Sequence, residues 1–160
     1  MRNKLTLKNR AIGYLARREY AGAELYRKLL PYAESEDQLE SLIRDLKSEG
    51  YLSDFRFAQQ LVEVRSRRFG SRRISHELRK HGLAAEIVDA FLVQIKAEES
   101  DHIKSVWQKK FGRPAEDALE QMKQQRFLQN RGFSHDAIRQ LFITLGEGED
   151  LNFPVVDEMG

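Results

Sequence analysis

Apolar residues recur every three or four positions along almost the whole chain. This spacing places them on one face of an amphipathic helix. No stretch shows a convincing period of two, so the pattern predicts an all-α protein. Glycines stand where the predicted helices should end, at Gly50, Gly70, Gly82, Gly112 and Gly132.

Serines mark several of the predicted helix starts. Ser35 is followed three residues later by Gln38, and Ser53, Ser71 and Ser134 each precede a periodic segment. Periodicity and caps together predict nine helices. Their expected ranges are 6–18, 21–32, 35–49, 54–69, 72–81, 84–97, 100–111, 114–131 and 134–145.

The chain resembles itself at a period near fifty residues. Shifted forward, segment 77–92 aligns with 127–142, so that Gly82 meets Gly132. Any three amphipathic helices look somewhat alike, but here the register of glycine, apolar residue and cap also recurs. We expect three degenerate three-helix repeats in tandem, forming an elongated, curved array. Their predicted ranges are 1–52, 53–98 and 99–146, followed by an acidic tail at 147–160 that we expect to be disordered.

The tail has a second interpretation. Because it is acidic and carries a short apolar stretch, it could instead fold back on a basic face and compete with a partner.

The net charge of +2 conceals an alternation along the chain. Residues 1–33 and 55–82 each hold eight Lys or Arg against two Asp or Glu, whereas 34–54 and 83–101 are acidic. In the first two repeats, the first two helices are therefore basic and the third is acidic. Either the acidic third helix neutralises its own repeat, or the array has one basic and one acidic face.

Catalytic chemistry finds little support in the sequence. The 160 residues include no cysteine, which excludes disulfides and thiolate sites. The four histidines lack the spacing of a metal site, and no glycine-rich phosphate loop occurs. The acidic groups at 34–37 and 98–101 are expected to complement helix N-termini rather than to form a catalytic pair. We therefore expect no enzyme activity, no metal and no cofactor.

The sequence also points away from membranes. It has no apolar run of the roughly 20 residues that a membrane span needs, and its N-terminal region lacks the pattern of a signal peptide. We expect a cytoplasmic protein without a membrane partner.

The most unusual segment is arginine-rich and spans residues 64–81. Two arginine pairs flank the predicted turn at Phe69 and Gly70, where a helix also begins. Guanidinium groups bind phosphates and carboxylates in bidentate fashion, and a helix N-terminus adds free N–H groups. A solvated basic face is the alternative, although so many like charges are easier to explain by a partner. The candidate residues are Arg65, Arg67, Arg68, Arg72, Arg73, Arg79 and Lys80.

A second, weaker basic cluster lies near the N-terminus. Tyrosines accompany it and could stack on bases, although core packing is favoured for Tyr14. The cluster comprises Arg17, Arg18, Arg27 and Lys28, with Tyr14, Tyr20 and Tyr26 beside them.

These motifs resemble the RecX family of recombinase regulators. The similar stretches are A-x-x-Y-L-A-R-R-E-Y at 11–20, GYLSDFRFA at 50–58, G-x-x-x-I-x-x-E-L at 70–78 and RFLQNRGFS at 126–134. The resemblance covers about 11–145. The chain departs from the family pattern at Ala21, where a capping Ser is frequent, and at Ser53, where Asp is common.

The resemblance implies tandem three-helix modules that regulate RecA. Members of this family bind the groove of the RecA–single-stranded-DNA filament, block its extension or promote its disassembly, and so inhibit ATP hydrolysis and strand exchange. We therefore expect a monomeric, non-enzymatic regulator whose partner is the RecA filament, with single-stranded DNA bound weakly or through the filament.

An independent DNA-binding module of the helix-turn-helix kind remains the alternative. It would bind naked DNA tightly and with a steep salt dependence. The modest net charge of the chain favours weak, filament-dependent affinity for DNA instead.

Overall fold

The computed structural model describes residues 5–146, and this part of the chain contains α-helices and one short 3-10 helix but no strand. The predicted all-α class is confirmed. The acidic tail at 147–160 lies outside the described residues. The elements are α1 (Leu7–Leu15), α2 (Gly22–Leu29), η1 (Leu30–Tyr32), α3 (Glu36–Ser48), α4 (Asp54–Arg65), α5 (Ser71–Lys80), α6 (Ala85–Lys110), α7 (Ala118–Asn130) and α8 (His135–Thr144).

One long helix, α6, replaces the two helices predicted at 84–97 and 100–111. The prediction of a break was wrong because the intervening residues, including Ala97, Glu98 and Glu99, favour helix and no Gly or Pro interrupts them. The acidic group at 98–101 therefore lies inside a helix and not at its N-terminus. The next helix, α7, begins four residues later than predicted, where Asp117 accepts a hydrogen bond from the N–H of Glu120 at 2.7 Å.

The described chain divides into two compact units. Unit 1 comprises the residues up to Val64 together with Ser75–Phe91. Unit 2 comprises Arg65–Ile74 together with the residues from Leu92 onward. Helices α4, α5 and α6 each contribute to both units, and the repeat boundaries expected after residues 52 and 98 stay predictions.

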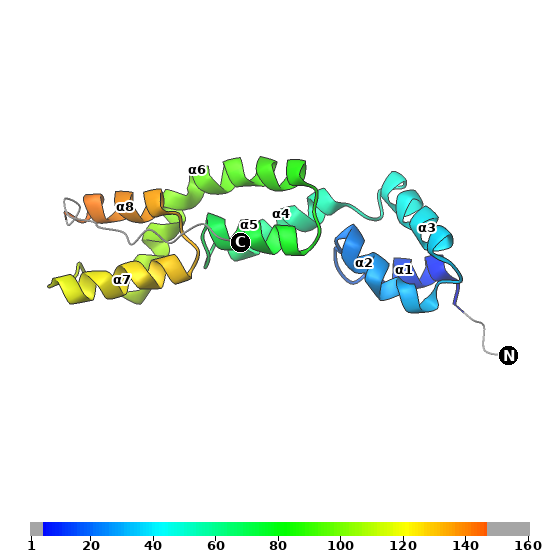
Figure 1. Cartoon of the computed structure of the whole chain (residues 1–160), viewed down its shortest axis with the longest axis horizontal. Helices are drawn as coiled ribbons and strands as arrows, with labels where there is room; N and C mark the ends of the chain where they lie inside the picture. The colour runs from blue at the N-terminus through cyan, green and yellow to red at the C-terminus, as the bar shows by residue number, and fades with distance from the viewer. Residues whose placement is uncertain (1–4, 147–160) are drawn as a thin grey trace. The chain divides into compact units, whose positions relative to one another are not determined.

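In unit 1, helices α1, α2 and α3 pack around a common apolar core (Figure 1). Leu25, Leu29, Leu39 and Leu46 lie at its centre and are fully buried. Burying a leucine side chain contributes about 1.5–3 kcal/mol, so these four side chains supply much of the stability of the triplet.

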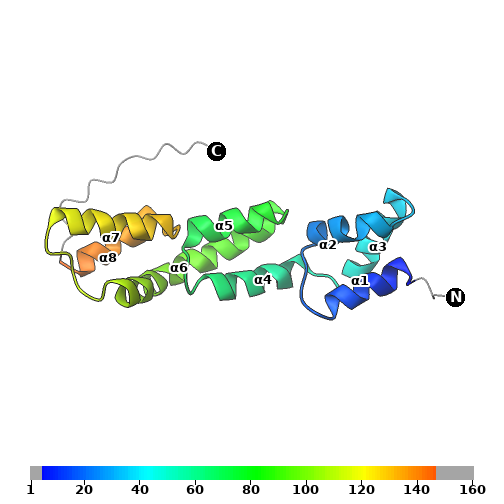
Figure 2. The same cartoon turned by 90° about the horizontal axis from the view of Figure 1, so that it is seen from below.

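In unit 2, the second half of α6 packs with α7 and α8 (Figure 2). The core includes Trp107, Leu128, Phe133 and Phe142, all buried. The indole N–H of Trp107 donates to the Oε1 of the buried Gln124 at 2.9 Å, which gives both polar groups a partner.

The predicted serine caps are present at three helix starts. The hydroxyl oxygens of Ser35, Ser53 and Ser134 each accept a hydrogen bond from the N–H three residues later, at 3.1–3.2 Å. Four of the five predicted helix-stop glycines adopt a positive φ, which L side chains rarely tolerate. Gly70 does not.

Candidate functional site

The turn between α4 and α5 carries the centre of the predicted arginine cluster. Arg67, Arg68, Arg72 and Arg73 are all exposed there. The N–H of Phe69 donates to the carbonyl of Arg65 at 2.9 Å, which closes the end of α4. The turn lies in unit 2, so that unit presents four guanidinium groups within seven residues of chain.

This turn docks backbone to backbone against a second turn, at residues 131–134. The N–H of Gly70 donates to the carbonyl of Arg131, and the N–H of Arg72 donates to the carbonyl of Gly132, both at 2.9 Å. A Cβ at Gly70 would lie only 2.3 Å from the Cα of Phe133. Gly70 is therefore required by the close approach of two backbones, and not by a left-handed helix end as the sequence suggested.

A buried carboxylate joins the same two turns. Glu99, which is 3% exposed, accepts hydrogen bonds from the backbone N–H of Ser71 at 3.1 Å and of Ser134 at 2.9 Å. Both serine hydroxyls also donate to it, at distances between 2.9 and 3.2 Å. These N–H groups belong to the N-termini of α5 and α8, whose positive dipole ends stabilise the negative charge.

The N-termini of α5 and α8 thus take the place of a positively charged partner for Glu99. Among the described residues, no Lys, Arg or His forms an ion pair with its carboxylate. A buried charge is tolerated only when it is fully hydrogen-bonded, and two helix ends provide that here. The result is a rigid support beneath the arginine turn.

Phe69 is the aromatic centre of the exposed side of the turn. The guanidinium carbon of Arg73 lies 3.9 Å from the ring centroid of Phe69, that of Arg131 lies 5.4 Å away and that of Arg65 lies 5.8 Å away. Such cation–π contacts hold the guanidinium groups in place. Arg72 approaches His135, with 3.2 Å between Nη1 and Nε2.

Arg131 is a member of this cluster that sequence reasoning missed. It lies more than fifty residues from Phe69 in the chain and carries no basic neighbour. Arg131 lies in RFLQNRGFS, one of the stretches that resemble the RecX family. Its contact with the ring of Phe69 follows only from the docking of the two turns.

The remaining candidates of the arginine-rich segment lie at the other end of α5. Arg79 and Lys80 are exposed and occupy the last turn of the helix, where cations complement the dipole. This end of α5 belongs to unit 1.

The N-terminal basic cluster, in unit 1, is organised around a tyrosine. Tyr20 is only 3% exposed, so it packs in the core and its ring is not available to stack on bases. Lys28 donates to the Tyr20 hydroxyl at 3.2 Å and lies 4.5 Å from the ring centroid of Tyr14, which packs against the core as predicted.

Arg18 in this cluster is already engaged within the molecule. It forms an ion pair with Glu24 and lies over the ring of Tyr20, 3.6 Å from the centroid. Its hydrogen bond to Glu24 raises the pKa of the Arg18 guanidinium above its ordinary value. Arg17 and Arg27 are exposed, so the cluster offers less uncompensated charge than its sequence suggests.

Two other classes of site find no support in residues 5–146. No group of three or more His, Cys, Asp or Glu in this part of the chain could hold a metal ion. In the same part, none of the helices has the length and apolarity needed to cross a membrane.

Comparison with known proteins places these features in a family. Residues 53–92 match the family model for the second three-helix domain of RecX, and residues 97–142 match that for the third. The "Regulatory protein RecX" of Ralstonia nicotianae is 44% identical over 140 residues, which cover 88% of each chain. That of Herbaspirillum seropedicae is 42% identical over 149 residues, covering 93% of this chain and 97% of the relative.

A solved structure has a similar fold. The crystal structure of RecX from Lactobacillus salivarius superimposes with a TM-score of 0.77 at 23% sequence identity, covering 88% of this chain and 94% of that one. The relatives are named as regulatory proteins, which agrees with the expectation of a non-enzymatic role. On the strength of its sequence identity and its matching domains, this chain belongs to the RecX family.

Proposed function

We propose that this protein inhibits RecA by binding in the groove of the RecA–single-stranded-DNA filament, where it blocks extension or promotes disassembly. By doing so it would modulate recombination and DNA repair in the cytoplasm. Membership of the RecX family supports the proposal, because the relatives with the highest similarity reported above are named regulatory proteins.

The observation that carries the proposal is the rigid arginine turn of unit 2. Five exposed guanidinium groups, from Arg65 to Arg73, surround a turn fixed by backbone hydrogen bonds and by the buried Glu99. A preorganised cluster loses little entropy when it binds an anion. Phosphates of DNA and carboxylates of protein are both suitable ligands for it.

Several weak contacts in one chain would raise the affinity for a filament. We propose that the protein acts as a monomer and that its three predicted repeats, 1–52, 53–98 and 99–146, contact successive RecA protomers. Each contact would then raise the effective concentration of the next repeat at its own protomer. The second contact would be the N-terminal cluster, in which Arg17 and Arg27 are exposed.

The test is the ATPase activity of RecA on single-stranded DNA, measured with increasing amounts of this protein. We expect inhibition at less than one molecule per RecA protomer, because one bound chain would affect several protomers. Absence of inhibition even at equal concentrations, with RecA filaments verified by electron microscopy, would contradict the proposal.

A further inference from the structure

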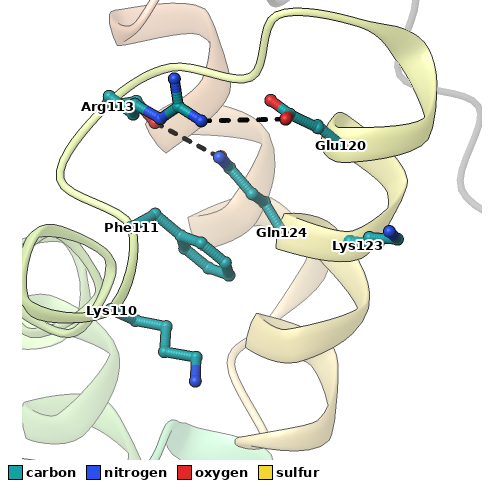
Figure 3. Close-up of a pocket in the computed structure, with 6 residues that line it drawn as sticks. All are labelled: Lys110, Phe111, Arg113, Glu120, Lys123 and Gln124. Atoms are coloured by element: carbon teal, nitrogen blue, oxygen red, sulfur yellow. Dashed lines mark hydrogen bonds and ion pairs between the residues drawn. The ribbon is translucent and has the colours of Figure 1, made fainter.

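A second feature of unit 2 lies outside the arginine turn. Between the end of α6 and the helix α7 is a cleft of about 280 Å³ (Figure 3). The ring of Phe111 and the side chain of Gln124 point into it, with Lys110 on the α6 side and Lys123 on the α7 side. Arg113 and Glu120 complete the lining.

The charges around the cleft are unequally balanced. Arg113 is paired with Glu116 at 2.7 Å and faces Glu120 at 3.9 Å. Glu120 is the only carboxylate among the described residues that line the cleft, and it therefore already has a cation beside it. Lys110 and Lys123 form no ion pair with any residue of the described chain. The described residues that line the cleft therefore carry a net positive charge beside the ring of Phe111.

The ring of Phe111 is only partly used within the protein. Phe111 meets Phe127 edge to face, with ring centroids 5.4 Å apart and an interplanar angle of 87°. An arrangement of this kind covers at most one face of the Phe111 ring. Phe111 is half-buried, so part of it remains accessible from the cleft.

The cleft is connected to the arginine turn by a series of alternating cations and rings. Phe127 lies on α7. The Nζ of Lys110 lies 5.4 Å from the centroid of its ring, and the guanidinium carbon of Arg131 lies 5.1 Å from the same centroid. Arg131 also contacts Phe69, which in turn contacts Arg73. The order along the surface of unit 2 is thus Lys110, Phe127, Arg131, Phe69 and Arg73.

We propose that this cleft binds one nucleotide of a single-stranded nucleic acid, with the base on Phe111 and the adjoining phosphates on Lys110 and Lys123. The neighbouring nucleotides would follow the cation–aromatic series toward Arg73. This inference rests on the proposed function in one respect, since the RecA filament is where the protein would meet a single strand.

The chemistry favours a single strand over the other anions of the cell. Single-strand binding sites combine backbone-tracking cations with aromatic rings on which bases stack. The stacked bases of a duplex offer no free face to Phe111. An acidic peptide would satisfy the lysines but would gain little from alternating rings. The cleft is also smaller than the roughly 300–1,000 Å³ of a site for a drug-sized molecule, which suits one base.

The protein contains its own reporter for this site. Trp107 is the single tryptophan, it is buried, and its indole N–H donates to Gln124, which lines the cleft. A ligand that displaces or polarises Gln124 should change the emission of Trp107, whereas a ligand bound elsewhere should leave it unchanged.

The experiment titrates the full chain, without RecA, with oligothymidylate of about 16 nucleotides, near the upper end of single-strand site sizes. Binding is followed by the anisotropy of a labelled strand and by Trp107 fluorescence. We expect binding that changes both signals. Phe111→Leu should weaken it about tenfold, as expected for the loss of one stacked base.

The charge contribution is tested with a matched pair of variants. Lys110→Gln with Lys123→Gln should reduce the slope of log K against log salt by about 1.4, at about 0.7 per phosphate for single strands. Lys104→Gln with Lys109→Gln removes the same charge from exposed residues of α6 that do not line the cleft. This control should retain the parental slope and the fluorescence change.

Three outcomes would overturn the inference. The first is that oligothymidylate does not bind, and the second is that the cleft variants bind it as well as their controls do. The third is that polyglutamate binds instead of oligothymidylate and that the cleft variants lose this binding. Because RecA is absent from the assay, these results are independent of RecA inhibition. Inhibition without strand binding would reject the cleft alone, and strand binding without inhibition would reject the proposed function alone.

Discussion

Gly132 and Arg73 approach each other so closely that a Cβ atom at Gly132 would lie 2.4 Å from the Cβ of Arg73. The two residues belong to the two docked turns of unit 2, and Gly132 also has a φ of +83°. Two separate demands therefore meet at this glycine. One is backbone conformation, and the other is the space needed to place the arginine turn.

The two demands can be separated with a pair of substitutions. Gly50 has a similar φ of +80°, but a Cβ there would meet no atom of residues 5–146 within 4 Å. Gly50→Ala should lower the free energy of unfolding by about 1–2 kcal/mol through its backbone conformation alone. Gly132→Ala should lower it by a further 1–3 kcal/mol, roughly, because the turns must separate. Urea denaturation followed by circular dichroism measures both, and equal losses would contradict the docking of the turns.

Local features of this fold were accessible from the sequence, whereas the contacts that build the site were not. Ser35, Ser53 and Ser134 cap helices within three residues of themselves, so a short window is enough to recognise them. The false break near residue 98 arose because acidic residues are frequent at helix starts. Here Glu99 lies inside α6 and accepts hydrogen bonds from the N-termini of two other helices, α5 and α8.

The support of the arginine turn depends on distant parts of the chain. Glu99 lies 28 residues from Ser71 and 35 from Ser134, and no local pattern distinguishes it from its acidic neighbours. The same holds for Arg131, whose aromatic partner Phe69 lies on another element. Only packing reveals such residues, since helical periodicity reports which face is buried and not which helix covers it.

Glu99 should prove the most sensitive acidic residue of unit 2. Glu99→Gln keeps one acceptor oxygen but removes the charge that both helix ends stabilise, so we expect a loss of about 1–3 kcal/mol of stability. Glu98→Gln alters the exposed neighbour and should cost less than about 0.5 kcal/mol. The buried Trp107 lies in the same unit and reports its unfolding by fluorescence. A similar loss in both variants would show that the buried network contributes nothing special.

The positive charges of Arg72 and Arg73 should be needed for inhibition but not for folding. Arg72→Glu with Arg73→Glu reverses two charges at the turn, and we expect at least a tenfold rise in the concentration that half-inhibits the RecA ATPase, which corresponds to about 1.4 kcal/mol. Helicity by circular dichroism should be unchanged.

A matched variant controls for the change in net charge. Arg126→Glu with Arg139→Glu makes the same change at exposed residues of α7 and α8. It should inhibit like the parent protein. If both double variants lose inhibition equally, the effect is one of overall charge and the turn is not the contact.

In unit 1, the start of α2 is also stabilised by a carboxylate from another helix, as Glu99 stabilises the starts of α5 and α8. Its N-cap residue, Ala21, makes no side-chain hydrogen bond, and Asp54 of α4 instead accepts from the N–H of Gly22 at 2.7 Å. Asp54→Ala should therefore lower the free energy of unfolding by about 1 kcal/mol, as expected for the loss of a helix cap. Adding Ala21→Ser would create a Ser three residues before Glu24, which is the pattern of a capping box. The second substitution should restore most of the loss in the Asp54→Ala background and add little to the parent. Calorimetry of the four proteins measures this coupling, and strictly additive effects would mean that the two residues do not serve the same helix end.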